Sequence, residues 1–439
     1  MDIEPSENCE HDSVKVIIGD EVKENLCGIS TFWSSGQNKY FSTNVLRINF
    51  TSDTLNMEQY TGFSLTFSAV DLNECEDPAQ NNCSHFCSNY IGGYFCSCRP
   101  GYLLLPDKHT CAVIDCGPPT NIDNGLVIFN QTTHRSEATY SCASEYYTPA
   151  SGDGTFRCPS NGLWANKDGG QELPRCVPVC GIFKPSQTPR GRIFGGQIAE
   201  PGQFPWQIAF VSPSRGCGAL ISDRWILTAA HVVQDKESPE MYGGVINLRH
   251  KKQENLLKAK KIIVHPSWIT QENEDRVSYN HDIALILLCS KVKLGPLISP
   301  ICLPGSDHGM SPTLYQRAYI AGWGATEKKE RTVNLLFTTV SLSKIEKCQE
   351  LNKEEKYIFT SNMLCAGDAN GHDSCKGDDG GPLMVFQDGR MYTAGITSWG
   401  VNCGKFGVYT KVENYMDWIK ETMERVEMEE DGSPDPECA

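Results

Sequence analysis

Two side chains suited to proton transfer lie in short apolar runs of the sequence. His231 ends the run LTAAH, and its imidazole, whose ordinary pKa lies near neutrality, is a natural general base. Asp282, in HDIALILL, offers a carboxylate that could hold such an imidazole in its productive tautomer. A third carboxylate, Asp379, lies in the glycine-rich run GDDGG. An isolated histidine is usually structural and an aspartate can simply cap a turn, so the surrounding segments must decide.

These segments predict a mainly β, multidomain protein. The chain has 439 residues, 39% of them hydrophobic, which is enough for one substantial core and smaller modules. The first 70 residues alternate apolar and polar side chains, as in VKVIIGD, and this pattern predicts half-buried strands. Near the C-terminus, helical spacing of apolar residues predicts a helix that includes Val412, Tyr415, Met416, Ile419, Met423 and Val426.

Cysteine usage indicates a secreted protein held together by disulfides. The chain has 21 Cys, concentrated between Cys75 and Cys180. Glycosylation sequons at Asn49, Asn82 and Asn130 agree with an extracellular surface. The acidic start MDIEPSENCE has no basic or apolar segment of a signal peptide, so we expect the natural start to lie upstream.

The formal charge of −15 disfavours nucleic acid and anionic membranes as main partners, because both attract clustered cations. No apolar run approaches the ~20 residues that span a bilayer. Basic or calcium-bridged protein partners fit this composition better.

Six cysteines between residues 71 and 111 follow the spacing of an epidermal-growth-factor (EGF) module. They are Cys75, Cys83, Cys87, Cys96, Cys98 and Cys111. The segment resembles the calcium-binding subtype, and this implies that Asp71, Glu74 and Asn89 supply the oxygen ligands that hard cations prefer. Acidic residues in a turn-rich segment can also be merely solvated, but Tyr94, just before the last close pair of cysteines, favours the calcium site.

Two further segments resemble extracellular modules. Residues 1–70 resemble the second half of a CUB domain, which implies a Cys9–Cys27 disulfide and a calcium triad of Glu4, Asp12 and Asp53. The first half is absent, so a complete sandwich cannot close.

Residues 116–176 resemble a complement-control (sushi) module, with Trp164 ahead of the last cysteine. Four cysteines permit three pairings, and the resemblance implies Cys116 with Cys158 and Cys142 with Cys176. We expect this module to be a spacer that holds the next domain.

The C-terminal half resembles the chymotrypsin-like serine proteases, which form two antiparallel Greek-key barrels with the active site between them. The motifs that carry this resemblance, in order, are RIFGG, LTAAHVV, HDIALILL, AGWG, DSCKGDDGGP and TSWG. It implies that His231 is the general base, that Asp282 orients it, and that Asp373 lies at the base of the specificity pocket. Gly400 and Gly407 would leave the pocket walls open, which implies a preference for Arg or Lys.

The same resemblance implies an activation mechanism. Cleavage between Arg192 and Ile193 would free an ammonium group that pairs with Asp378. This pairing would order the backbone N–H groups of Gly377 and residue 379 as an oxyanion hole. The implied disulfides are Cys180–Cys302, Cys348–Cys365 and Cys375–Cys403, and they leave Cys217, Cys289 and Cys438 unassigned.

Asp379 occupies the position where these proteases carry the nucleophilic serine. A carboxylate that attacks an amide must expel an amine, a much worse leaving group than the carboxylate, so the intermediate collapses backwards. Its charge would also pair with His231 and repel the oxyanion near Gly377. Loss of one triad member costs on the order of 10⁴ to 10⁶ in turnover, so the sequence predicts an inactive protease domain.

The order of modules resembles the complement-initiating proteases, which implies calcium, a partner protease and a collagen-like recognition subunit as partners. A second CUB and a second sushi module of that family are absent. Expected boundaries are 1–70 (partial CUB), 71–111 (EGF-like), 114–178 (sushi), 179–192 (activation linker), 193–426 (protease) and 427–439 (acidic tail).

Three functions remain open at this point: an Arg/Lys endopeptidase if Asp379 replaces a native serine, a pseudoprotease decoy or scaffold, and a calcium-dependent interaction protein. The basic runs 249–261 and 327–331 are either substrate exosites or solvated loops.

Overall fold

The computed structural model describes the chain except for residues 1, 29–44, 55–58, 69, 184–195, 214, 235–237, 269–271, 274–275, 306–312, 315, 326–331, 352–356, 368–376, 401–405, 430–437 and 439. Contacts divide the chain into two units, residues 1–115 with 159–162 and residues 116–158 with 163–439. Among the described residues, no helix has both the length and the apolar character needed to cross a bilayer.

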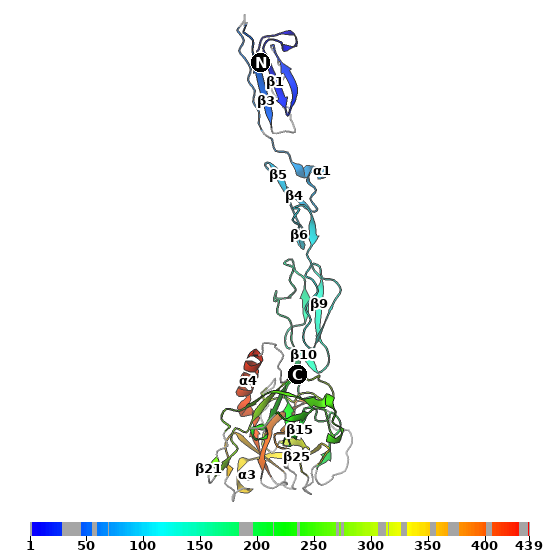
Figure 1. Ribbon diagram of the computed structural model, residues 1–439, viewed down its shortest axis with the longest axis vertical. Helices are drawn as coiled ribbons and strands as arrows, with labels where there is room; N and C mark the ends of the chain where they lie inside the picture. The colour runs from blue at the N-terminus through cyan, green and yellow to red at the C-terminus, as the bar shows by residue number, and fades with distance from the viewer. Residues whose placement is uncertain are drawn as a thin grey trace. The chain divides into compact units, whose positions relative to one another are not determined.

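The first unit begins with a three-stranded antiparallel sheet in the order β2-β1-β3 (Figure 1). The strands span Ser13–Ile18 (β1), Glu21–Leu26 (β2) and Leu46–Thr51 (β3), after a short turn η1 (Glu7–Cys9). Val14 and Val16 of β1 are buried, as expected for one covered face, and the Cys9–Cys27 disulfide ties the entry of the sheet to its second strand. Among the described residues of the segment 1–70, this is the one sheet.

The rest of the first unit consists of short hairpins. Its elements are η2 (Glu74–Glu76), α1 (Pro78–Asn81), the pair β4 (Phe86–Tyr90) and β5 (Gly93–Ser97), and the pair β6 (Tyr102–Leu104) and β7 (Cys111–Val113). Disulfides join Cys75–Cys87, Cys83–Cys96 and Cys98–Cys111. Among the described residues 71–115, Cys96 is the one fully buried hydrophobic side chain, so covalent links stabilise this segment in place of a core.

The second unit begins with two small sheets, β12-β11-β9-β8 and β10-β13. Their strands are β8 (Gly125–Phe129), β9 (Glu137–Cys142), β10 (Tyr147–Pro149), β11 (Thr155–Arg157), β12 (Ala165–Asn166) and β13 (Cys176–Pro178). The structure forms the disulfides Cys116–Cys158 and Cys142–Cys176, which is the pairing that the sushi resemblance implied. The Trp164 indole donates to the carbonyl of Gly117 at 2.8 Å.

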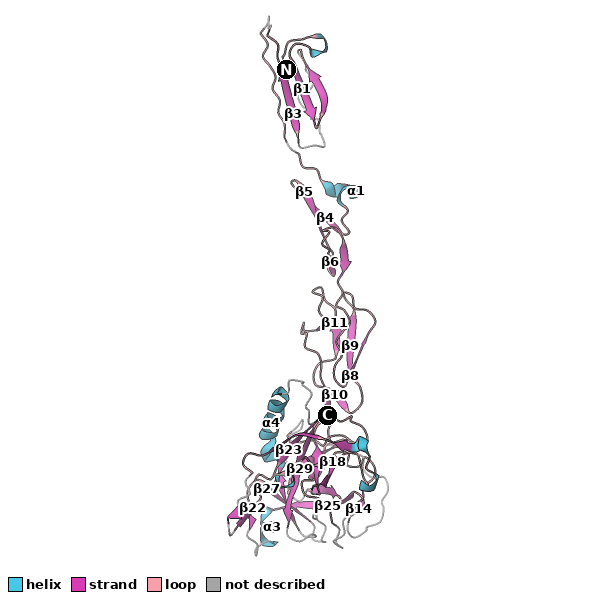
Figure 2. Cartoon of the chain, viewed as in Figure 1, coloured by secondary structure: helices cyan, strands magenta, loops and turns pink. Residues whose placement is uncertain are grey.

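Residues 193–439 are called the trypsin-like part below, because their motifs resemble those of chymotrypsin-like proteases. This part contains two seven-stranded sheets, and strands dominate it (Figure 2). The first sheet contains β15 (Gln207–Ser212), β16 (Gly216–Leu220), β17 (Trp225–Thr228), β18 (Glu240–Tyr242), β19 (Leu256–Leu257), β20 (Ala259–Val264) and β23 (Ala284–Leu288). The second contains β14 (Gln197–Ile198), β24 (Arg317–Gly322), β25 (Leu336–Ser343), β27 (Met363–Gly367), β28 (Pro382–Gln387), β29 (Arg390–Gly400) and β30 (Gly407–Lys411), and a β25–β27 pairing closes it. Smaller elements are α2 (Ala230–Val233), η3 (Leu248–His250), η4 (Gln253–Asn255), β21 (Glu272–Asn273), β22 (Arg276–Ser278), α3 (Ile345–Leu351) and β26 (Tyr357–Ile358).

Two fully buried apolar strands bring the proton-transfer residues together. Every residue of β17 and of β23 is buried, and burial of each large side chain contributes about 1.5–3 kcal/mol. The strands pair antiparallel, with Thr228 opposite Ala284. His231 follows β17 and Asp282 precedes β23, so both lie at the same end of this strand pair.

The C-terminal helix forms where helical spacing predicts it, but it starts later. Helix α4 spans Met416–Glu429, while Val412 and Tyr415 lie in a preceding 3₁₀ turn, η5 (Val412–Tyr415). The expected tail 427–439 is also not free at its described positions. Glu427 accepts a hydrogen bond from the Trp225 indole at 2.8 Å, and Cys438 forms a disulfide with Cys289, so these two cysteines are partners.

Limited trypsin cleavage after Arg192 should not release the trypsin-like domain. Arg192 lies outside the described residues, but the structure forms the Cys180–Cys302 disulfide, which joins the two sides of that cut. We expect two fragments on a reducing gel and one band without reductant. A double Cys→Ser variant at 180 and 302 is the control that should separate without reductant, and separation of the unaltered chain would contradict the link.

The stability of the trypsin-like part should fall in mild acid. Burial, and then the neighbouring His281, lower the pKa of His265 to about 4. The unfolded chain binds this proton near pH 6.5, so below that pH the unfolded state holds more protons and stability falls until about pH 4. The denaturation midpoint, measured from neutral pH to about pH 5, should fall less in His265→Gln. An equal fall in both proteins would contradict the assignment to His265.

Candidate active site

His231 lies on the one-turn helix α2, which follows β17 directly. Its Nδ1 is 2.7 Å from Oδ2 of Asp282, and its backbone N–H donates to Oδ1 of the same carboxylate at 2.9 Å. The His231 side chain keeps 26% of its surface exposed, whereas Asp282 is fully buried. The Asp282 carboxylate therefore holds the imidazole at Nδ1, and the exposed part of the ring leaves Nε2 available to accept a proton, as a general base requires.

The buried Asp282 is supported by two residues that the sequence motifs do not reveal. The Ser398 hydroxyl donates to Oδ2 of Asp282 at 2.5 Å, and the Thr410 hydroxyl donates to its backbone carbonyl at 2.8 Å. A buried carboxylate needs such donors, because an unpaired one carries a large desolvation cost. Ser398 belongs to the motif TSWG, which is the one signal in the sequence that could have drawn attention to it, but the motif alone assigns it no role.

Asp379 lies beside this dyad with its carboxylate turned toward the backbone that should form the oxyanion hole. The Gly377 N–H donates to Oδ2 of Asp379 at 3.4 Å. Desolvation raises the pKa of the Asp379 carboxyl, while His231 and the Gly377 N–H act in the opposite direction. The donor expected to stabilise an oxyanion therefore faces a carboxylate of the same chain.

The tight backbone around Asp379 depends on glycine. Gly380 has φ of 82°, and a Cβ there would lie 2.3 Å from the Thr228 hydroxyl and 2.5 Å from the Cys217 carbonyl. The Cys217 N–H donates to the carbonyl of Asp379 at 2.8 Å. Cys217, which the resemblance left unassigned, is a buried free thiol whose pKa is raised by burial.

Asp378 is held against two glycines of the neighbouring loop. Its Oδ1 accepts from the Gly324 N–H at 2.8 Å. A Cβ on Gly322 or Gly324 would lie 1.8 Å or 2.7 Å from the carboxyl group, so both positions must lack a side chain. Arg192, Ile193 and Asp373 lie outside the described residues, as do Cys375 and Cys403.

The expected pocket glycines and several aromatic rings flank the dyad. Gly400 and Gly407 face each other across β29 and β30. Tyr279, which the sequence did not single out, has its ring centroid 6.0 Å from that of His231 and 6.0 Å from that of Trp399. Trp399 also stacks on Tyr357 at 4.4 Å. These rings form an aromatic wall beside the imidazole.

The EGF-like segment brings together two of its three expected calcium ligands. The Asn89 amide donates to Oδ2 of Asp71 at 2.6 Å, and the Gly92 N–H donates to Oδ1 at 2.7 Å. The side chain of Glu74 contains a buried oxygen, Oε2, without a hydrogen-bond partner. A buried unpartnered carboxylate oxygen fits a cation site, because a cation would supply the missing interaction.

The CUB-like sheet also gathers its expected acids. Oδ1 of Asp12 accepts from the Asp53 N–H at 3.0 Å, and Oε2 of Glu4 is buried without a hydrogen-bond partner. His11 joins them, with Nδ1 3.6 Å from Glu4 and 3.3 Å from Asp53. His11 directly precedes Asp12 in the chain, but the acidic triad did not include it.

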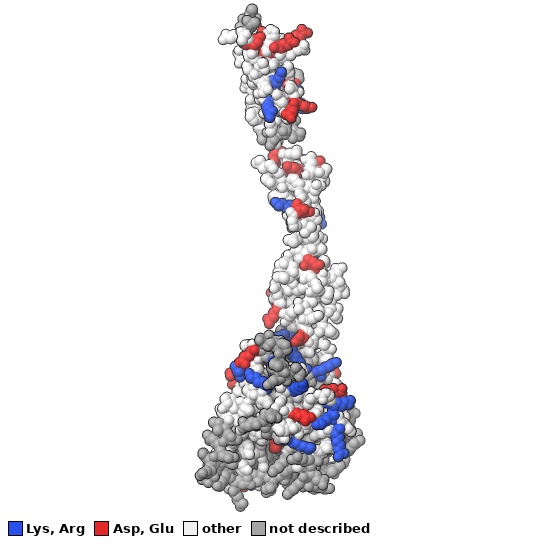
Figure 3. Space-filling model, in the orientation of Figure 1, with Lys and Arg blue, Asp and Glu red and all other residues white. Residues whose placement is uncertain are grey.

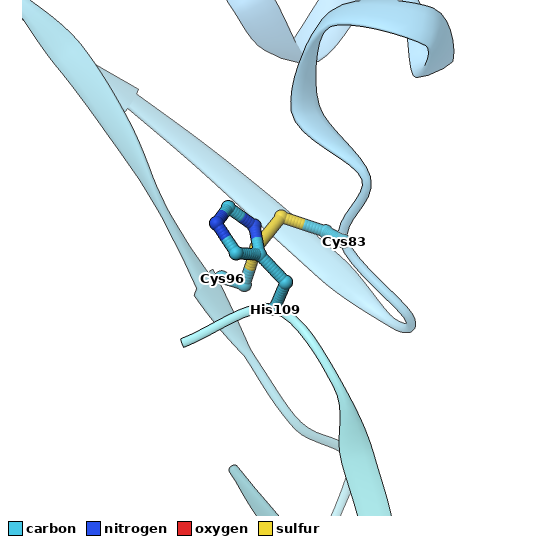
Figure 4. A group of neighbouring side chains, drawn as sticks. All are labelled: Cys83, Cys96 and His109. Atoms are coloured by element: carbon cyan, nitrogen blue, oxygen red, sulfur yellow. A yellow bond between two sulfur atoms is a disulfide. The ribbon is translucent and has the colours of Figure 1, made fainter. Parts of the chain in front are cut away.

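A third cluster, Cys83, Cys96 and His109, has metal-ligand residue types but not metal-ligand chemistry. Figure 4 shows the two sulfur atoms joined as a disulfide beside the imidazole. The His109 Nδ1 lies 3.1 Å from the carbonyl of Asn81. Disulfide sulfurs are not thiolate ligands, so this cluster is structural.

The basic run 249–261 is partly neutralised. Several Lys and Arg side chains lie on the face of the trypsin-like part drawn in Figure 3. Within the run, Lys251 lies 3.3 Å from Glu240, Lys252 lies 3.3 Å from Glu254, and Lys261 lies 3.4 Å from Glu429. The run contains parts of η3 and β20 and all of η4 and β19, so the expected loop is wrong, but the ion pairs still favour a solvated surface over an exosite. The run 327–331 lies outside the described residues.

The asparagines of the three expected glycosylation sequons, Asn49, Asn82 and Asn130, are exposed.

Residues 193–419 match the sequence model of the trypsin family, and residues 116–176 match the Sushi repeat (SCR repeat). Residues 75–111 match the model described as Coagulation Factor Xa inhibitory site. Complement C1s subcomponent of Sus scrofa is 31% identical over 97% of this chain and 91% of its own length, and the Rattus norvegicus protein is 30% identical over the same shares. This chain belongs to the trypsin family of serine proteases.

Within the trypsin family, this chain is C1s-like. A calcium-dependent serine proteinase of Mesocricetus auratus is also 30% identical, over 97% of this chain and 90% of that protein. The alignment to the rat protein runs over 631 positions, more than the 439 residues of this chain, so gaps must open within it. Among solved structures, the serine protease neuropsin of mouse brain is 35% identical, with a TM-score of 0.46 over 53% of this chain and 100% of that chain.

Proposed function

We propose that this C1s-like protein is a non-cleaving member of its family, which keeps the protease fold and its binding modules but does not hydrolyse peptide bonds. The observation that carries this proposal is the Asp379 carboxylate at the nucleophile position, in contact with the Gly377 N–H. Attack by this carboxylate would form an acyl anhydride as the amide C–N bond broke. The amine is the worse leaving group, so the tetrahedral intermediate would return to substrate.

The electrostatics of the site oppose catalysis as well. An oxyanion would have to displace the Asp379 carboxylate from the Gly377 N–H, and both groups carry negative charge. Desolvation raises the pKa of the Asp379 carboxyl, and the nearby His231 acts in the opposite direction, so a positive imidazolium would favour the ionised carboxylate. The unaltered chain, cleaved after Arg192, should therefore neither hydrolyse arginine esters nor take label from serine-directed reagents. Either activity would overturn the proposal.

A second candidate is an Arg/Lys endopeptidase whose native residue at position 379 is serine. The intact hydrogen bond between His231 and Asp282, at 2.7 Å, favours it, because a general base is of no use without a nucleophile. The two candidates differ only in residue 379, and sequencing of the transcript across that codon separates them. Asp373 would then supply the preference for Arg or Lys.

Calcium is proposed to bind the N-terminal modules, at Asp71, Glu74 and Asn89 and at the triad of Glu4, Asp12 and Asp53. The buried unpartnered oxygens of Glu74 and Glu4 support this proposal, and so does the similarity to the calcium-dependent serine proteinase of Mesocricetus auratus. Calcium would connect the EGF-like segment to its CUB neighbour and thereby shape a docking surface.

The proposed partners are a partner protease and a collagen-like recognition subunit of complement. The proposed setting is secreted and extracellular, which the disulfides favour.

Calcium titration of the full chain should show binding in the range of ~10⁻⁴–10⁻³ M, which is typical of extracellular modules. Glu74→Gln should weaken the affinity about tenfold, because it removes a charge from the proposed ligand set. Glu76→Gln is the matched control, since Glu76 is an exposed neighbour whose carboxylate accepts from the Asn73 amide. Isothermal calorimetry without a heat of binding, or an equal effect of both variants, would contradict the site.

A further inference from the structure

Asp282 lies at the centre of a tight turn whose flanking residues are anchored separately. The Ile283 N–H donates to the carbonyl of His281 at 2.8 Å, which closes the turn around Asp282. His281 has φ of 61°, in the left-handed region that few non-glycine residues adopt, although His is enriched there together with Asn and Asp. Such a backbone persists only where its surroundings hold it. The direction of the Asp282 carboxylate therefore depends on what holds His281.

The residue that fixes the His281 ring most directly is Tyr415, in η5. The Tyr415 hydroxyl lies 3.1 Å from Nδ1 of His281. Burial raises the pKa of Tyr415, so the hydroxyl stays protonated and can donate to Nδ1 of His281. Tyr415 thus holds the His281 ring in place.

His265 holds both sides of the same turn. Its ring stacks on that of His281, with centroids 5.0 Å apart and planes 5° from parallel. Its backbone N–H donates to the carbonyl of Ile283 at 3.1 Å. The His265 ring is itself fixed, because its Nδ1 accepts from the Ser267 N–H at 3.1 Å and Trp418 packs against it with centroids 4.9 Å apart.

We propose that Tyr415 and His281 are positioning residues for Asp282, and through it for the Nδ1–H of His231. Thr410, in β30 just before η5, donates to the Asp282 carbonyl at 2.8 Å, so the segment that leads into α4 contacts both His281 and Asp282. The position of η5, the turn that leads into α4, is thereby coupled to the hydrogen bond between Asp282 and His231. None of these residues touches the reacting atoms.

The test uses the downfield proton resonance of the His231 Nδ1–H in the full chain, so it does not depend on whether the protein is active. His231→Gln identifies the resonance by removing it. Tyr415→Phe keeps the buried ring and removes only the hydroxyl. We expect Tyr415→Phe to shift the resonance upfield. We also expect the Nδ1–H to exchange with solvent about fivefold faster, which is the rate change expected for the loss of one neutral hydrogen bond.

A matched set of variants separates positioning from simple packing. His281→Asn should retain the resonance, because an amide oxygen can accept from Tyr415 and Asn tolerates the left-handed backbone. His281→Ala should lose it, and if that variant does not fold, Tyr415→Phe alone decides. Val426→Ala, at a buried position near the end of α4, should lower the melting temperature and leave the resonance unchanged. An unchanged resonance in Tyr415→Phe, or loss of it in His281→Asn, would overturn the proposal.

Discussion

Asp379→Ser in the chain cleaved after Arg192 should raise arginine-ester hydrolysis by at least about 10⁴ over the unaltered chain, which is the low end of what one triad member contributes. The physical reason is that the rest of the proton-transfer machinery is in place. Nδ1 of His231 is 2.7 Å from Asp282, and Ser398 supports the carboxylate at 2.5 Å. The substitution would also free the Gly377 N–H from the carboxylate that now accepts from it.

The measurement is steady-state hydrolysis of an arginine ester, together with labelling by a serine-directed reagent. Asp379→Asn is the matched control, because it removes the charge without supplying a hydroxyl, and it should stay inactive. A folded, cleaved Asp379→Ser protein that remains inactive would show that the rest of the site has changed as well. In that case Asp379 would pair with the Ile193 ammonium in place of Asp378. The hydrogen bond from the Gly324 N–H to Asp378 would then be the first contact to examine.

The parts of the fold that local sequence encodes were predictable. Buried apolar runs such as Ala284–Leu288 became central strands, and the cysteine spacing around Cys116 and Cys142 was enough, with the sushi resemblance, to identify the partners. The Cys289–Cys438 disulfide was not predictable. Its cysteines are separated by 149 residues, and no spacing rule or resemblance links them.

The site followed the same rule. Motifs flanking His231 and Asp282 were sufficient to predict that these two meet, but they say nothing about what surrounds them. Ser398 lies 116 residues from Asp282, and Thr410 lies 128 residues away, so their support of the carboxylate is a product of how the two sheets pack. His11 was not predicted as a member of the acidic cluster, although it is close in sequence. The resemblance implied three acidic residues at set positions, and such a pattern does not include an imidazole.

Asp282→Asn, introduced into the Asp379→Ser protein, should lower kcat by about 10⁴ and leave KM nearly unchanged. Asp282 now accepts from three donors, namely the His231 N–H, its Nδ1–H and the Ser398 hydroxyl. An amide has only one acceptor oxygen. If that oxygen keeps the His231 backbone N–H, the amide N–H₂ faces Nδ1 and forces the proton onto Nε2, where it blocks the lone pair needed by the introduced serine.

Ser398→Ala in the same background separates the tautomer effect from a general loss of support. It removes one donor to Oδ2 but leaves both His231 contacts, so kcat should fall by only about tenfold, the effect expected for one hydrogen bond to a charged group. A loss in Asp282→Asn no larger than that in Ser398→Ala would contradict the tautomer argument. The Asp282 carboxylate would then act as packing, and the 2.7 Å contact with Nδ1 would not control which nitrogen of His231 carries the proton.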